Sequence, residues 1–144
     1  MLVLICVINN IYGTQIYATI EVAKHILNLN IDKHLANANA AIVDQIANIK
    51  IGNKEKNLYS FATKYCSWHN QDDYSIYDKY VDGILVAYRD HYAFAEFEHK
   101  QLRQYVLYKE VVEKFRKHFN LTQYSLKHLD KFLWLYGKEL FPPK

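Results

Sequence analysis

Glycine and proline are scarce in this chain, and that scarcity limits the folds open to it more than any other feature. Only four Gly and two Pro occur in 144 residues, whereas β-sandwiches and β-barrels need frequent turn residues. Hydrophobic residues make up 51% of the chain, a content that excludes an intrinsically disordered protein. The sequence therefore predicts an all-α fold with about seven or eight helices joined by short loops.

The length and the lack of a linker predict one domain. A chain of this size can bury about two thirds of its unfolded surface in one core. No internal repeat and no Ser/Pro/Gly-rich stretch divides the sequence. We expect a single compact α-helical domain over residues 1–144.

Apolar residues recur at helical spacing along most of the chain. Gly13 should end the first helix, and Gly137 should end the last one, which Ser125 should cap. We expect Ile20, Leu27 and Val106 to face inward, and Phe94, Phe97, Phe115, Phe119, Phe132 and Trp134 to form core. The expected helices cover residues 2–11, 15–29, 59–68, 78–88, 97–119 and 125–136, with an Ala-rich helix from about residue 39, a short turn over 32–35 and a polar loop over 51–56.

The opening run of apolar residues does not have the pattern of a targeting segment. Residues 1–8 lack a basic n-region and a small-residue cleavage site, and the run is far shorter than the roughly 20 residues that span a bilayer. We interpret it as a buried helix. Two cysteines are too few for a disulfide framework. A soluble, cytoplasmic protein without a membrane partner is the expectation.

Positive charge is concentrated in the last third of the chain. Residues 1–56 carry five Lys against four acids, whereas residues 100–131 carry eight Lys or Arg against three acids. Such a stretch is suited to a phosphate backbone, and it is equally compatible with a solvated helix face.

One stretch in the middle of the chain has a pattern of chemical interest. Ser60-Phe61-Ala62-Thr63-Lys64 opens a helix, and Asp78 follows fourteen positions after Lys64 within Asp78-Lys79-Tyr80-Val81. This order resembles the helix-hairpin-helix DNA glycosylases, whose hairpin reads Gly-hydrophobic-Gly-x-Lys and is followed by a segment ending in Asp-x-x-Val. The run from Leu2 to Gln15 is also similar to the first core helix and turn of that family, so the resemblance extends over about residues 2–90.

The resemblance implies a function and a set of residues. Lys64 would be the nucleophile that attacks the sugar of a nucleotide flipped out of DNA, and Asp78 would assist and stabilise the developing positive charge. Tyr65, Trp68, His69 and Tyr77 would bind the substrate. The chain has Ser60 and Ala62 where that hairpin carries glycines. Small residues keep room for a phosphate there, but they do not favour a positive φ.

Each of these residues also has a purely structural interpretation. The simpler interpretation of Lys64 is a solvated residue on a helix face, because Lys is almost never buried unless it is paired. Asp78 is a good helix N-cap whose carboxylate would accept from the amides of Tyr80 or Val81, and that role is compatible with catalysis.

Metal and cofactor sites are not expected. Cys66 and His69 lie three positions apart on one helix, but no further ligands have a suitable spacing for zinc. Cys66 is interpreted as a small buried hydrophobe rather than a nucleophile.

Tyrosines lead to the second functional hypothesis. Thirteen occur in the chain, and many cluster between residues 59 and 108. Tyr is common at protein interfaces. The alternative to a DNA glycosylase is therefore a non-catalytic helical protein that binds a partner protein, or another copy of itself, through a Tyr-rich surface.

Overall fold

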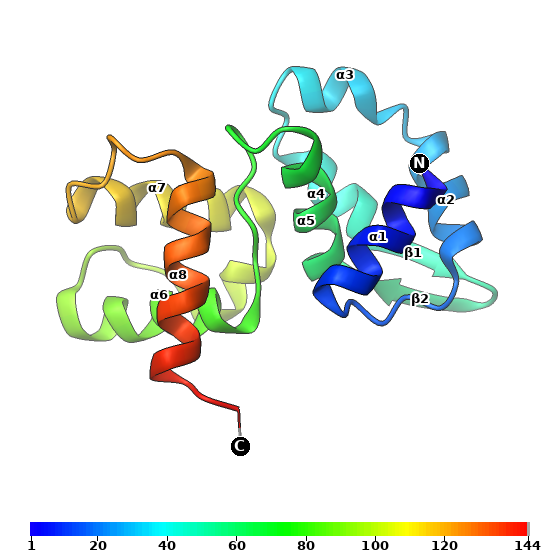
Figure 1. The fold of residues 1–144 in the computed structure, drawn as a ribbon. Helices are drawn as coiled ribbons and strands as arrows, with labels where there is room; N and C mark the ends of the chain where they lie inside the picture. The colour runs from blue at the N-terminus through cyan, green and yellow to red at the C-terminus, as the bar shows by residue number, and fades with distance from the viewer. Residues whose placement is uncertain (144) are drawn as a thin grey trace.

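The computed structural model describes residues 1–143, and in them it confirms the predicted all-α fold. The helices and the one small sheet form two lobes (Figure 1). The first lobe holds α1 to α5 and the hairpin, and the second holds α6 to α8. The elements are α1 (Leu2–Tyr12), α2 (Thr19–Asn28), α3 (Ile31–Ala36), α4 (Ala41–Ala47), β1 (Asn48–Ile51), β2 (Lys54–Asn57), α5 (Tyr59–His69), α6 (Lys79–Tyr92), the 3₁₀ helix η1 (His99–Arg103), α7 (Tyr105–His118) and α8 (Leu126–Leu140).

The two lobes share one hydrophobic core. The Tyr59 hydroxyl on α5 donates to the carbonyl of Leu102 at 3.0 Å. The Asp44 carboxylate on α4 accepts from the Tyr105 amide at the start of α7, at 3.1 Å. Buried apolar residues from α1 through α8 belong to a single cluster. The lobes are therefore parts of one compact domain, linked by the segment 70–78, which we call the strap.

Most tyrosines of the middle region lie in the core and do not form a surface. Four of their hydroxyls donate to backbone carbonyls, as Tyr105 does at Ser75 (3.0 Å) and Tyr108 at Ile76 (2.6 Å). A buried phenol needs such a partner. The expected Tyr-rich surface is thus wrong for the six that are at most 7% exposed, namely Tyr59, Tyr65, Tyr74, Tyr77, Tyr105 and Tyr108.

A β-hairpin replaces the end of the expected Ala-rich helix and the polar loop after it. α4 ends at Ala47, and β1 pairs antiparallel with β2 from Asn48↔Asn57 to Ile51↔Lys54. Ile49 is buried and Ile51 half-buried, while Lys50 between them is exposed. This alternation has the period of a strand, and Gly52 turns the chain at a φ of 60°.

The long helix expected over 97–119 begins eight residues late. Ala93 ends α6 in a left-handed conformation, and the chain then has no regular secondary structure up to Glu98. Glu98 and Gln101 form a capping box that starts η1, and α7 begins only at Tyr105. Leu102, Val111 and Phe115 are buried as expected, but Val106 is 44% exposed.

α8 begins as predicted but does not end where predicted. The Ser125 side chain accepts from the His128 amide at 3.3 Å and caps the helix. Gly137 lies inside the helix, which continues to Leu140, because its missing side chain lets α8 approach α6. A Cβ on Gly137 would lie 2.6 Å from the Cβ of Tyr80.

Two aromatic residues of α8 that we expected in the core lie outside it. Phe132 is 52% exposed and Trp134 is 39% exposed. The buried face of α8 instead carries Leu126, Leu129, Asp130, Leu133 and Gly137. Their spacing of three and four defines one helix face, which leaves both aromatic residues off it.

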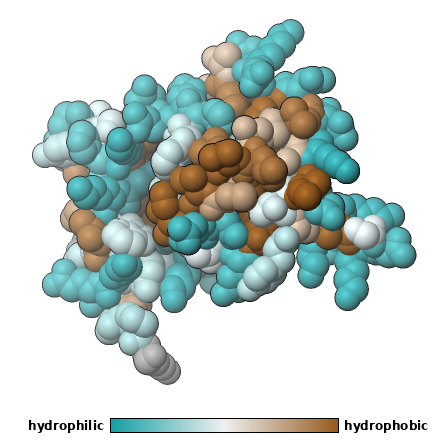
Figure 2. Space-filling model, turned by 45° about the vertical axis from the view of Figure 1, so that its right-hand side comes forward, coloured by the Kyte–Doolittle hydropathy of each residue, from teal (hydrophilic) through white to brown (hydrophobic). Residues whose placement is uncertain are grey.

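The expectation of a fully buried first helix is also wrong. Only Ile5 and Ile8 of α1 are buried, whereas Val3 is 76% and Ile11 61% exposed. In α2, Val22 and Ile26 face the core, so Ile20 and Leu27 are exposed. The exposed residues form the apolar surface that Figure 2 shows where α1 and α2 come forward. Within residues 1–143, no helix is long and apolar enough to cross a membrane.

Candidate functional site

A cleft lies where the two lobes meet. Its volume is about 470 Å³, and α1, α5, the strap, α6 and α8 all contribute to its wall. Most of the exposed surface of that wall is apolar, although five of its twelve lining residues are charged. Small-molecule and nucleotide sites have this composition.

Lys64 is buried in the wall of this cleft. Its side chain is 6% exposed, and its amine contacts the Ser60 hydroxyl at 2.5 Å, one turn earlier on α5. The amine also lies 5.4 Å from the centre of the Tyr12 ring. Burial lowers the pKa of Lys64, and the nearby Asp78 carboxylate offsets part of that effect. The interpretation of Lys64 as a solvated surface lysine is therefore wrong.

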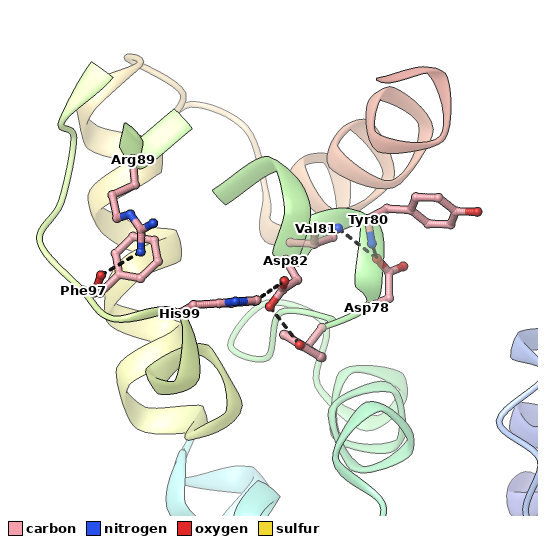
Figure 3. Close-up of polar contacts among 8 residues, drawn as sticks. Asp78, Tyr80, Val81, Asp82, Arg89, Phe97 and His99 are labelled. Carbon is pink, nitrogen blue, oxygen red and sulfur yellow. Dashed lines mark hydrogen bonds and ion pairs between the residues drawn. The ribbon is translucent and has the colours of Figure 1, made fainter. Parts of the chain in front are cut away.

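Asp78 faces the same cleft from the start of α6. Its carboxylate accepts from the amides of Tyr80 (2.9 Å) and Val81 (3.0 Å), which confirms the predicted N-cap (Figure 3). Lys64 and Asp78 both lie in the described part of the chain, and they form no direct ion pair. The Lys64 amine therefore has no carboxylate in direct contact with it, which leaves it accessible to a ligand in the cleft.

Asp130, which the sequence analysis did not single out, holds the strap in place. This carboxylate of α8 accepts from the Ser75 hydroxyl at 2.6 Å and from the Ile76 amide at 2.9 Å. Only 7% of Asp130 is exposed, and burial raises its pKa to about 7. On the other side, Thr63 accepts from the Tyr77 amide at 3.1 Å. These bonds fix the chain leading to Asp78. The sequence does contain a signal for this residue, because Asp130 is an acidic residue within an otherwise apolar helix face.

The substrate-binding residues expected from the resemblance divide into two groups. Trp68 lines the cleft and is 52% exposed. Tyr65 is buried against the His69 ring, 4.8 Å away, and neither residue lines the cleft. Tyr77 is also turned away from it, because its hydroxyl donates to Asp82 at 2.9 Å. The structure thus brings together Lys64, Asp78 and Trp68 of the predicted set.

α8 and α1 supply cleft residues that sequence reasoning missed. Lys127, Lys131 and Trp134 line the cleft from α8, and Tyr12 lines it from α1. The two lysines belong to the basic stretch over residues 100–131. Their position beside Lys64 depends on how the two lobes pack together.

Cysteine and metal chemistry have no support in this region. Cys66 is buried, and burial raises the pKa of its thiol to about 12, which keeps it protonated. Within residues 1–143, no group of three or more His, Cys, Asp or Glu residues could hold a metal ion.

Comparisons with known proteins place the chain among relatives whose role is not described. The model of the family HI_0787_N, described as an N-terminal domain, matches residues 1–73. A protein of Haemophilus influenzae, described as uncharacterized, is 44% identical over 135 residues, which cover 93% of this chain. The chain spans 64% of the length of that relative. No solved structure matches.

Proposed function

The chain belongs to the HI_0787_N family of N-terminal domains, and from the chemistry of its cleft we propose that it is a DNA glycosylase with lyase activity. Its substrate is a nucleotide flipped out of DNA into the space between the lobes. The proposal agrees with the resemblance of its lysine and aspartate segments to the helix-hairpin-helix glycosylases.

The buried amine of Lys64 is the observation that carries this proposal. An ammonium group has no free electron pair, so a lysine nucleophile needs a lowered pKa. Burial lowers the pKa of Lys64, and no carboxylate pairs directly with it in the described chain. A buried lysine that only stabilised the fold would be expected to carry a charged partner.

The proposed reaction uses Lys64 and Asp78 together. The electron pair of the amine forms a bond to C1′ of the sugar as the bond from C1′ to the base breaks. The amine loses a proton to the Asp78 carboxylate, which passes it to the departing base. The Asp78 charge also stabilises positive charge that develops on the sugar. The nitrogen electron pair then forms a second bond to C1′ as the bond from C1′ to the ring oxygen breaks, and the ring oxygen takes up a proton from water. This step leaves a protonated imine between Lys64 and C1′.

The residues that line the cleft support a flat ligand that enters from outside. Trp68 and Trp134 line it from opposite lobes, and both are partly exposed. Aromatic side chains of this kind stack on unpaired bases. Lys127 and Lys131 add positive charge at the same cleft.

Borohydride trapping tests the proposal directly. The protein is incubated with duplex DNA that carries an oxidised, deaminated or abasic nucleotide, and borohydride reduces the imine to a stable covalent adduct. We expect an adduct with the unmodified protein and with Lys33→Gln, an exposed lysine of the same lobe. Lys64→Gln should form none. Absence of an adduct across the whole panel would refute the lyase mechanism.

Binding of a partner protein without catalysis is the second candidate. The exposed apolar surface of α1 and α2, rather than the buried tyrosines, is the observation that favours it. Large exposed apolar surfaces often mark interaction sites. Two results would support this candidate. The protein would bind no DNA, and replacing Ile11 by a charged residue would abolish a protein–protein association that light scattering detects.

A further inference from the structure

One face of α8 carries an exposed row of lysines beside the cleft. Lys127, Lys131, Trp134 and Lys138 follow one another at intervals of four, three and four, so they lie along one side of the helix. All four are exposed, and we call them the α8 stripe. Lys127, Lys131 and Trp134 also line the cleft, whereas the Lys138 amine covers the Trp134 ring at 3.6 Å.

The charges of the α8 stripe are free to meet an anion. None of its three lysines forms an ion pair within residues 1–143. Asp130, the acid between Lys127 and Lys131, is buried and points to the strap. At 1.5 Å per residue, the stripe extends for about 16 Å, which is several phosphate spacings of a DNA strand.

The helix starts beside the cleft are poorly suited to hold a phosphate. At the start of α5, the Tyr59 amide donates to the Asn57 side chain at 3.2 Å, and the Ser60 hydroxyl donates to the Tyr77 carbonyl at 3.3 Å. At the start of α6, the Asp78 carboxylate already occupies the free amides. A second anion there would be repelled, so phosphate contacts must come from other residues.

We propose that the α8 stripe holds the phosphate backbone of the DNA strand whose nucleotide enters the cleft. Lys127 and Lys131 contact the phosphates that flank this nucleotide, since they alone of the three lysines line the cleft. The inference rests on the proposed function and assigns its strand-binding surface to the second lobe.

Salt dependence of DNA binding tests the α8 stripe. Binding of a duplex with one abasic site is measured between 50 and 200 mM salt (about the range over which phosphate contacts are sensitive) for the unmodified chain and for Lys127→Gln/Lys131→Gln. We expect the slope of log affinity against log salt to become shallower by about 2, because two phosphate contacts are lost.

Lys114→Gln/Lys117→Gln on α7 is the matched control. Both lysines are exposed and neither lines the cleft, so this pair should leave the slope unchanged. Circular dichroism checks that both variants fold. An equal change in both pairs, or no change in the α8 pair, would overturn the inference.

The outcomes separate this inference from the proposed function. DNA binding that depends on Lys127 and Lys131, without an adduct, would refute the lyase reaction and support the α8 stripe. An adduct with an unchanged salt slope would support the reaction and refute the stripe. A protein that binds no DNA at the lowest salt would refute both.

Discussion

Lys64 and Asp130 are two charged side chains that the fold removes from water within one cleft. Burial lowers the pKa of Lys64 and raises that of Asp130, so both shift toward the neutral form. The Lys64 amine donates to a hydroxyl and lies over the Tyr12 ring, whereas both oxygens of Asp130 accept hydrogen bonds. Asp130 therefore has a structural role at the strap, and Lys64 is the group that the proposed reaction uses.

At Asp78, replacement by Asn should change the pH dependence of trapping. Asn also caps helices well, so α6 should persist. The Asp78 charge raises the pKa of Lys64, and its loss should lower that pKa further. In a plot of the single-turnover trapping rate against pH, we expect the rising part of the curve to move to lower pH. We also expect the rate at the plateau to fall. A rising part that does not move would show that Asp78 does not act on the Lys64 amine.

For Asp130, the raised pKa predicts how stability depends on pH. The folded value of about 7 exceeds the ordinary value of 3.8, so the folded state binds the proton more tightly. Binding of this proton stabilises the folded state fully when the pH is below the ordinary pKa of 3.8. The stabilisation is lost as the pH rises through the folded pKa of about 7.

Asp130→Asn should remove this dependence. Its amide can still accept from Ile76 and can donate to Ser75, so the strap should stay in place. As pH rises from about 5 to about 7, the free energy of unfolding of the unmodified chain should fall relative to the variant by up to about 1.4 kcal/mol per unit. Urea titrations at each pH measure it. Parallel pH profiles for the two proteins would contradict the assignment.

At the scale of elements, glycine serves different purposes in two helices that pack together. Gly137 in α8 lies against the backbone and Cβ of Tyr80, whereas Gly83 in α6 faces the ring of Phe141. A Cβ would come within 2.6 Å of Tyr80 in the first case and 3.1 Å of the Phe141 ring in the second. Phe141 is 42% exposed and can move, but the turn of α6 at Tyr80 cannot do so easily.

Alanine at these two positions should therefore have opposite effects. Gly137→Ala should lower the free energy of unfolding by about 1–3 kcal/mol, because overpacking forces α6 and α8 apart. Gly83→Ala should be neutral or stabilising by up to about 1 kcal/mol, through the better helix propensity of Ala. Denaturant unfolding measures both. A stabilised Gly137→Ala protein would show that the two helices do not need this close contact.

Helix positions were predictable from the sequence more reliably than their interruptions. Tyr59 to Trp68 and the Ser125 cap were predicted because local periodicity and capping determine them. The hairpin at 48–57 and the late start of α7 at Tyr105 were not, because local helix preference competes there with pairing and packing partners distant in sequence. α1 illustrates the same limit, since an apolar helix does not reveal which side meets the core.

At the scale of the whole molecule, the two lobes should unfold together. The bonds from Tyr59 to Leu102 and from Asp44 to Tyr105 cross between them, and one core runs through both. We expect a single transition that coincides by far-ultraviolet circular dichroism and by tryptophan fluorescence, because Trp68 and Trp134 report on different lobes. Separate transitions would show that the boundary near residue 73, where the family match ends, divides independent domains.

The sequence by itself determined the helical class, the caps at Asp78 and Ser125, and the pairing of Lys64 with Asp78 as a candidate site. The helical class and the caps depend on residue types and on spacing within one or two turns, whereas the choice of Lys64 and Asp78 came from the resemblance of their segments to the helix-hairpin-helix glycosylases. Only the tertiary structure decided that Lys64 is buried, that Asp130 holds the strap, and that α8 brings Lys127, Lys131 and Trp134 to the cleft. Burial and the pKa shifts that follow from it depend on which lobes pack together, and a local pattern does not contain that information.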